Sequence, residues 1–149
     1  MILVSACLVG LRTRYDGEAK LVESLRDLVA RGEAIPVCPE QLGGLPTPRP
    51  PADLRDGGGE AVLEGSARLV SETGVDVTAQ FMRGAEETLA LARAAGVTRA
   101  ILKERSPSCG RLRVTIDGAL CPGMGVTAAL LARNGITIES EEDWLDKSS

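Results

Sequence analysis

Short apolar runs alternate along the chain with longer segments in which apolar residues recur every three or four positions. The short runs predict buried strands, and the recurrent spacing predicts amphipathic helices. A glycine follows each helical segment, where it commonly ends a helix. The predicted strands are 2–6, 34–37, 99–103, 113–116 and 136–138, and the predicted helices are 20–31, 78–95 and a segment that opens at 123–127 and runs through Ala132.

Strands that alternate with helices predict an α/β fold, Rossmann-like and three-layered, with a mostly parallel sheet. The apolar runs 61–64 and 67–71 flank Gly65 and Ser66, which predicts a small β-hairpin insertion. Residues 39–51 contain five prolines, so we expect a structured loop without regular elements there. We expect residues 1–149 to form a single domain.

Composition narrows the function classes. The chain has 149 residues, 44% hydrophobic and 26% charged, which is typical of globular proteins. It has no histidine, which excludes Ser-His-Asp triads, Cys-His dyads and HExxH zinc sites. Aromatic residues make up 2% and the net charge is -4, so we expect no extended nucleic-acid surface.

No apolar run approaches the roughly 20 residues of a membrane helix, and the opening segment has no positively charged region typical of export signals. We therefore expect a cytoplasmic protein with no membrane partner.

Three of the four cysteines follow predicted strands. Cys7, Cys38 and Cys109 each come just beyond a carboxyl end, where parallel sheets place their ligand sites. The alternative is core packing, because free cysteine is among the most buried residue types. Cys121 precedes Pro122 in a predicted loop and is either incidental or a fourth ligand.

Thiolates in this number suit two kinds of metal site. Structural zinc takes four ligands, and without histidine only Cys121 or a carboxylate would complete the set. Thiolates also suit iron–sulfur clusters. A [4Fe–4S] cluster with three protein thiolates keeps one iron open as a Lewis acid, whereas four thiolates indicate electron transfer or structure. The cysteine pattern by itself leaves these alternatives open.

Five segments of the sequence together resemble the thiouracil desulfidase (TudS) family. The resemblance covers essentially the whole chain, in order, and the proline-rich segment and the Ser-Pro-Ser-Cys-Gly turn are its most distinctive parts. The matching segments are 4–10 (VSACLVG), 14–17 (RYDG), 38–49 (CPEQLGGLPTPR), 103–110 (KERSPSCG) and 123–131 (GMGVTAALL).

The resemblance implies a [4Fe–4S] cluster with three cysteine ligands and one open iron. Carried over by motif, the ligands are Cys7, Cys38 and Cys109. The open iron would take the sulfur of a thiocarbonyl, water would replace it, and sulfide would be released. The resemblance also implies Glu40 as the acid–base residue. The implied substrate is a small thiolated pyrimidine base or nucleotide.

The resemblance further implies that Ser106 and Ser108 lie near the substrate. Each of these side chains also has an ordinary structural alternative. Serines beside a proline commonly cap turns, and a loop glutamate such as Glu40 is commonly exposed. The glycines at 123–125 would let backbone N–H groups at a helix start bind an anion, or would simply begin the helix. Several basic residues near the strand ends would balance the thiolates or hold an anionic substrate: Arg12, Arg14, Lys103, Arg105 and Arg111.

Segment 117–122 departs from the family pattern. It is shorter than usual and contains Cys121.

Two other functions compete with the desulfidase. A persulfide-type sulfurtransferase would depend on one cysteine more than on the others. A structural or sensor metal protein would unfold on metal loss and would not need Glu40. The sequence leaves the oligomeric state and the choice between 2-thio and 4-thio substrates open.

Overall fold

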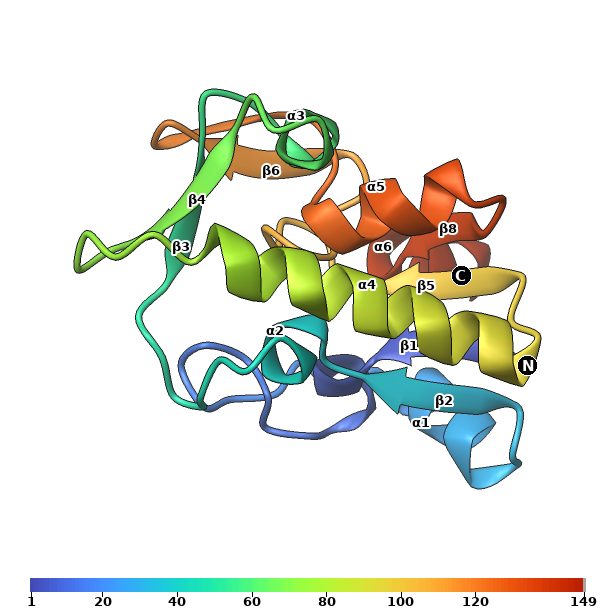
Figure 1. Ribbon diagram of the computed structural model, residues 1–149. Helices are drawn as coiled ribbons and strands as arrows, with labels where there is room; N and C mark the ends of the chain where they lie inside the picture. Colours follow the sequence, from blue (N-terminus) through green and yellow to red (C-terminus); the bar gives the residue numbers. More distant parts are fainter. Residues whose placement is uncertain (149) are drawn as a thin grey trace.

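A four-stranded parallel sheet organises the chain, in the order β2-β1-β5-β8 (Figure 1). The structure is a computed structural model that describes residues 1–148. In the register of the sheet, Ile2 lies opposite Ala34 on one side and Arg99 on the other. The strands are β1 (Ile2–Ser5), β2 (Ala34–Val37), β5 (Arg99–Leu102) and β8 (Thr137–Ser140).

Helices cover both faces of this sheet, which confirms the predicted three-layer α/β fold. On one face Leu89 and Ala92 of α4 and Leu131 of α5 pack against the strands. On the other face Leu25 of α1 packs with Val4. The helices are α1 (Glu23–Ala30), α4 (Thr78–Ala95), α5 (Val126–Arg133) and α6 (Glu141–Ser148), with a 3₁₀ turn, η1 (Ala6–Val9), after β1.

A second sheet stands beside the first, in the order β4-β3-β6-β7. The sheet consists of two antiparallel strand pairs, β3 with β4 and β6 with β7. The two pairs are joined by a parallel contact between β3 and β6, in which Leu54 lies opposite Ile116. Its core contains Phe81 of α4, so the long helix packs on both sheets. The strands are β3 (Ala52–Arg55), β4 (Arg68–Ser71), β6 (Arg113–Ile116) and β7 (Ala119–Pro122).

The predicted hairpin at 61–71 is wrong. Its first run lies in a short helix, α3 (Gly59–Leu63), and its second run, β4, pairs with β3 instead. A four-residue apolar run does not distinguish a strand from a helical turn. The proline-rich segment also contains one helical turn, α2 (Pro39–Leu42), which has proline at its first position, where proline is favoured.

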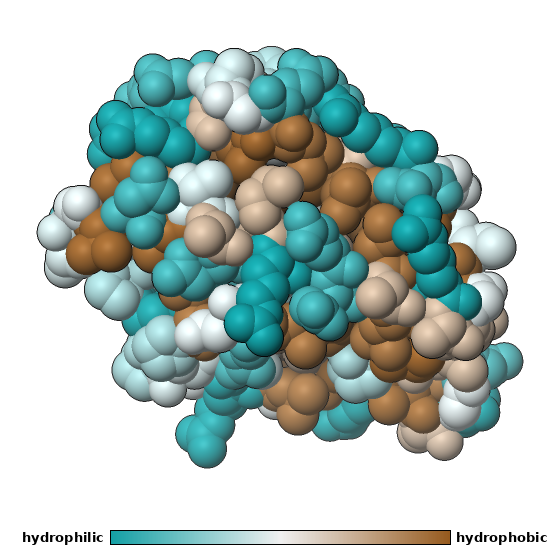
Figure 2. Space-filling model, in the orientation of Figure 1, coloured by the Kyte–Doolittle hydropathy of each residue, from teal (hydrophilic) through white to brown (hydrophobic). Residues whose placement is uncertain are grey.

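The surface is mixed in polarity. On the face shown in Figure 2, hydrophilic side chains are interspersed with hydrophobic ones. Within residues 1–148, no helix has the length and apolar character needed to cross a membrane.

Candidate functional site

A cavity of about 430 Å³ opens beyond the carboxyl ends of β1, β2 and β5. Residues from both sheets line it, among them Ser5 at the end of β1 and Ala52 and Thr115 of the second sheet. The fold therefore places a cavity where parallel α/β sheets commonly bind ligands.

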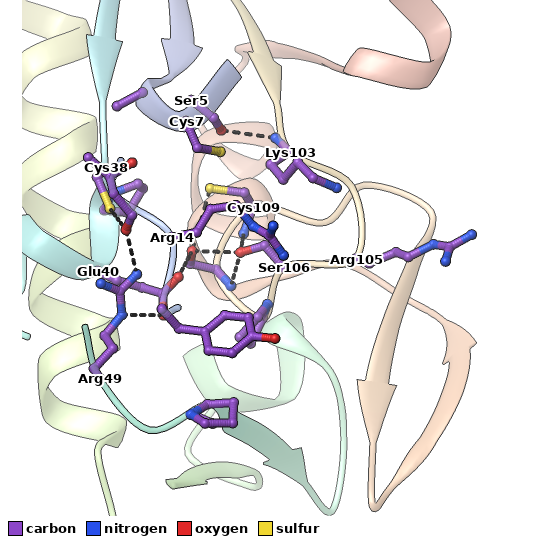
Figure 3. Close-up of a pocket in the computed structure, with 18 of the residues that line it drawn as sticks. Ser5, Cys7, Arg14, Cys38, Glu40, Arg49, Lys103, Arg105, Ser106 and Cys109 are labelled. Carbon is purple, nitrogen blue, oxygen red and sulfur yellow. Dashed lines mark hydrogen bonds and ion pairs between the residues drawn. The ribbon is translucent and has the colours of Figure 1, made fainter. Parts of the chain in front are cut away.

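The three cysteines expected to act together all line this cavity (Figure 3). Cys7 lies in η1 directly after β1, and Cys38 lies between β2 and α2. Cys109 lies in the loop between β5 and β6. Cys7 and Cys109 are buried, and Cys38 is partly buried. Cys121 stands apart on β7, does not line the cavity, and donates to the carbonyl of Ala119 over 3.2 Å.

Burial keeps these thiols protonated in the free chain. It raises the pKa of Cys7 to about 11 and that of Cys109 to about 12, and it also raises the pKa of Cys38. A reactive persulfide cysteine needs a lowered pKa, because the thiolate is the nucleophile. A bound metal would deprotonate the thiols directly. The environment therefore disfavours a free thiolate nucleophile at any of the three positions.

The loop that carries Cys109 is closed by a buried carboxylate. Glu104 is 1% exposed, and its Oε1 accepts four backbone N–H groups. At the tip of the loop, the Ser106 hydroxyl accepts the N–H groups of Ser108 and Cys109, at 3.2 and 3.1 Å. The structural alternative for Ser106, capping a turn, is thus observed. The donors to Glu104 are the N–H groups of Arg105, Arg111, Leu112 and Arg113, at 3.2, 2.8, 3.0 and 3.2 Å.

Glu40 points into the site rather than into solvent. Its Oε1 lies 3.4 Å from Nε of Arg49, and its Oε2 lies 3.4 Å from the hydroxyl of Ser108 (Figure 3). The same Ser108 hydroxyl lies 3.4 Å from Sγ of Cys109. Burial raises the pKa of Glu40, although Arg49 opposes the shift. Glu40 and Ser108 therefore connect the Cys38 and Cys109 segments across the cavity.

The basic residues divide into two groups. Arg14, Lys103 and Arg105 line the cavity, and Arg12 and Arg111 do not. Lys103 Nζ pairs with Glu141 of α6 at 2.9 Å, so its charge is partly balanced.

The N–H groups at the start of α5 are engaged by the chain itself and are not available to an anion. The N–H groups of Val126 and Thr127 donate to the carbonyls of Pro107 and Ser108, at 3.0 and 2.8 Å. The start of α5 therefore holds the Cys109 loop in place, and its N–H groups are already used.

The spacing of the donors bears on which metal fits. Among residues 1–148, no three Cys, Asp or Glu side chains stand close enough to bind one metal ion. A [4Fe–4S] cluster binds each thiolate through a different iron, so its ligands stand farther apart than those of a zinc ion. Three thiols that line one cavity, in a chain without histidine, are a donor set that an iron–sulfur cluster accepts.

Comparison with known proteins agrees with this geometry. The sequence profile of the 2-thiouracil desulfurase family matches residues 2–143. The chain belongs to the 2-thiouracil desulfurase family. Its sequence is 46% identical over 149 residues to the uncharacterized protein YbbK of Bacillus subtilis (strain 168), covering 98% of this chain and 99% of that protein.

A solved structure is also similar to this member of the 2-thiouracil desulfurase family. It is described as the [4Fe-4S]-dependent thiouracil desulfidase TudS, with a TM-score of 0.81 and 47% identity over 99% of this chain and 97% of that one. The family, the enzyme class and the fold predicted from the sequence are thereby confirmed. The roles of individual side chains stay predictions.

Two buried charged residues of the site were not singled out from the sequence. Arg49 and Glu104 both lie inside the family motifs, and Glu104 stands between Lys103 and Arg105, which were chosen for their charge. From the sequence alone, a charged side chain within a proline-rich segment or beside a strand end is expected to be exposed to solvent. Only its burial shows that it has internal partners.

Proposed function

We propose that this chain replaces the sulfur of a thiolated pyrimidine, as free base or nucleotide, by oxygen and releases sulfide. Membership of the 2-thiouracil desulfurase family supports this reaction. The likeness to a [4Fe-4S]-dependent thiouracil desulfidase supports an iron–sulfur cofactor. The observation that carries the proposal is that Cys7, Cys38 and Cys109 come from three separate segments and line one cavity with Glu40.

In this proposal Cys7, Cys38 and Cys109 hold a [4Fe–4S] cluster. When bound, the cluster supplies a thiophilic Lewis acid at its one iron that lacks a protein thiolate. Cys121 takes no part, because it lies on β7 outside the cavity. The buried thiols lose their protons on binding, so uptake of the cluster releases protons.

Glu40 moves the protons of the reaction. Exchange of C=S for C=O consumes one water and releases hydrogen sulfide, with no net electron transfer. The Glu40 carboxylate accepts one proton from the attacking water and gives it to the departing sulfur, and the second proton of that water leaves the carbon-bound oxygen through solvent as the C=O bond forms. Burial raises the pKa of Glu40, which suits a group that alternates between the two forms. Ser108 donates to Glu40 and holds that carboxylate toward the cavity.

Ser106 has a supporting role. Its hydroxyl accepts the N–H groups of Ser108 and Cys109, and it lies 3.1 Å from the hydroxyl of Ser108. Ser106 therefore fixes the turn that places Cys109, a proposed cluster ligand, and the hydroxyl of Ser108 at the same cavity. Ser106 also lines the cavity, so we expect it to lie near a bound substrate.

The test is anaerobic reconstitution with iron and sulfide, followed by iron and sulfide counts and by sulfide release from 4-thiouracil and 2-thiouracil. Cys7→Ser, Cys38→Ser and Cys109→Ser should lose turnover to a comparable extent, since each removes one of three ligands. Cys121→Ser is the matched control and should keep both cluster and turnover. Glu40→Gln should keep the cluster and lose turnover.

Two results would overturn the proposal. Stoichiometric zinc binding without cluster uptake would indicate a structural metal protein. Loss of activity at only one cysteine, with the other two variants active, would indicate persulfide chemistry.

A further inference from the structure

Tyr15 is the only aromatic residue among the described residues that line the cavity. Its side chain is 41% exposed, although large apolar surfaces are usually buried. The two other aromatic residues of the chain lie elsewhere. Phe81 is buried in the core of the second sheet, and Trp144 of α6 packs behind the first sheet. A planar ligand in the cavity thus has one ring on which to stack.

Arg49 ties down the backbone at and before Tyr15. The N–H of Arg49 donates to the carbonyl of Tyr15 over 2.8 Å, and Nη2 of Arg49 donates to the carbonyl of Thr13 over 3.0 Å. The side chain of Arg49 is 4% exposed and also contacts Glu40. One buried arginine therefore fixes the position of the tyrosine relative to the carboxylate of the site.

The ring of Tyr15 is held as well. The guanidinium carbon of Arg14 lies 5.7 Å from the ring centroid, which is within the range of a cation–π contact. Arg14 in turn pairs with Asp16 at 3.6 Å. Arg14 lies over one face of the ring, so a ligand would stack on the opposite face. Because the ring is already restrained by Arg14 and by its backbone, it loses less freedom when a ligand stacks on it.

We propose that Tyr15 stacks its ring on the heterocycle of the substrate and thereby selects planar aromatic thiocarbonyls. The inference rests on the proposed desulfuration, because it names the part of that site that recognises the ring. Stacking requires only a π-face and no particular hydrogen-bond pattern. It therefore distinguishes a thiopyrimidine from an open-chain thiocarbonyl such as thiourea, and it acts on binding rather than on the chemical step.

The experiment uses the anaerobically reconstituted chain and two readouts. Calorimetry measures the dissociation constant of uracil, and steady-state kinetics measure KM and kcat for 4-thiouracil. Tyr15→Leu and Tyr15→Met remove the ring in two shapes, and Tyr15→Phe keeps it. Leu11→Ala is the control, because Leu11 is 48% exposed nearby and does not line the cavity.

Loss of the ring should weaken uracil binding at least about fivefold. KM for 4-thiouracil should rise by a similar factor with little change in kcat, which marks an interaction equal in ground and transition states. Tyr15→Phe and Leu11→Ala should behave as the unmodified chain. Urea, an open-chain carbonyl without a ring, should displace uracil from the variants no better than from the unmodified chain.

Each contrary result has a separate meaning. If the unmodified chain releases sulfide and the Leu and Met variants bind uracil as tightly as it does, the stacking role is wrong and the desulfuration stands. If the unmodified chain releases no sulfide while uracil binding still depends on the ring of Tyr15, the desulfuration is wrong and the stacking subsite stands.

Discussion

The guanidinium of Arg49 lies 3.4 Å from the carboxylate of Glu40, and only 4% of the Arg49 side chain is exposed. The same guanidinium donates to the carbonyls of Thr13 and Pro46 and to the hydroxyl of Thr47. It therefore joins the proline-rich segment, the loop before α1 and the acid of the site. A buried cation with this many acceptors is an anchor for all three.

We expect Arg49→Met to lower the free energy of unfolding by about 3 kcal/mol, because it leaves a largely buried carboxylate without its partner. Arg31→Met is the matched control: Arg31 pairs with Glu33 at 2.7 Å, but its side chain is 62% exposed. An exposed pair contributes about 0–1 kcal/mol. Urea unfolding of both variants measures the difference, and equal losses would contradict the anchoring role of Arg49.

Glu104→Gln should destabilise the loop that carries Cys109. Hydrogen bonds to a charged acceptor contribute about 1.5–3 kcal/mol each, and the amide is a weaker acceptor for the four N–H groups that now share Oε1. We expect faster hydrogen exchange at the amides of Arg105 and Leu112 and a lower iron content after reconstitution. Glu87→Gln, on the exposed side of α4, should change neither. Unchanged exchange at both amides would show that the carboxylate is dispensable.

Gly125→Ala should displace the Cys109 loop. A Cβ at Gly125 would lie 2.4 Å from the carbonyl carbon of Ser108 and 2.7 Å from the backbone nitrogen of Cys109. Because both contacts are with backbone, we expect a loss of about 1–3 kcal/mol or more. At Gly58 the nearest atom would lie at 3.5 Å, so Gly58→Ala is the control. Thermal unfolding and iron content check both variants, and matching values would contradict the close approach.

Glu139 should contribute stability that acid removes. The hydrogen bond from Arg99, together with Lys147, holds the pKa of Glu139 below its ordinary value of 4.5. Its stabilisation is therefore complete above pH 4.5 and is lost as the pH falls through the lower, folded-state pKa. We expect Glu139→Gln to cost about 0.5–1 kcal/mol at pH 7 and less at acid pH. Urea unfolding of both proteins across this range measures it, and a pH-independent difference would contradict the assignment.

The two inner strands of the central sheet, β1 and β5, were predictable from the sequence, because they are short, largely apolar runs buried on both faces. Leu3, Ala100 and Ile101 of that sheet are fully buried. The long helix α4 was predictable for a similar reason, since its apolar residues recur on one face and Gly96 ends it in a left-handed conformation. These signals are local, so a single sequence carries them.

The second sheet was not predictable in the same way. In β3 only Leu54 is fully buried, and its partner in β6 is Ile116, distant in the sequence. Run 61–64 had the apolar character of a strand, but β4 pairs with β3 instead, with Leu69 opposite Leu54. Strand pairing depends on which partner is within reach, and a single sequence does not specify the partner.

The sequence by itself determined the kind of chemistry this protein holds. Three cysteines after predicted strands, no histidine and the family motifs already indicated a thiolate metal site with Glu40 nearby. The tertiary structure decided which side chains share the cavity and how they are held. It separated Cys121 from the other thiols and buried Arg49 against Glu40. It also folded the loop 105–113 so that four of its backbone N–H groups donate to one oxygen of Glu104. Burial and hydrogen-bond partners arise from segments that meet only in the folded chain, whereas residue type and spacing are present before folding.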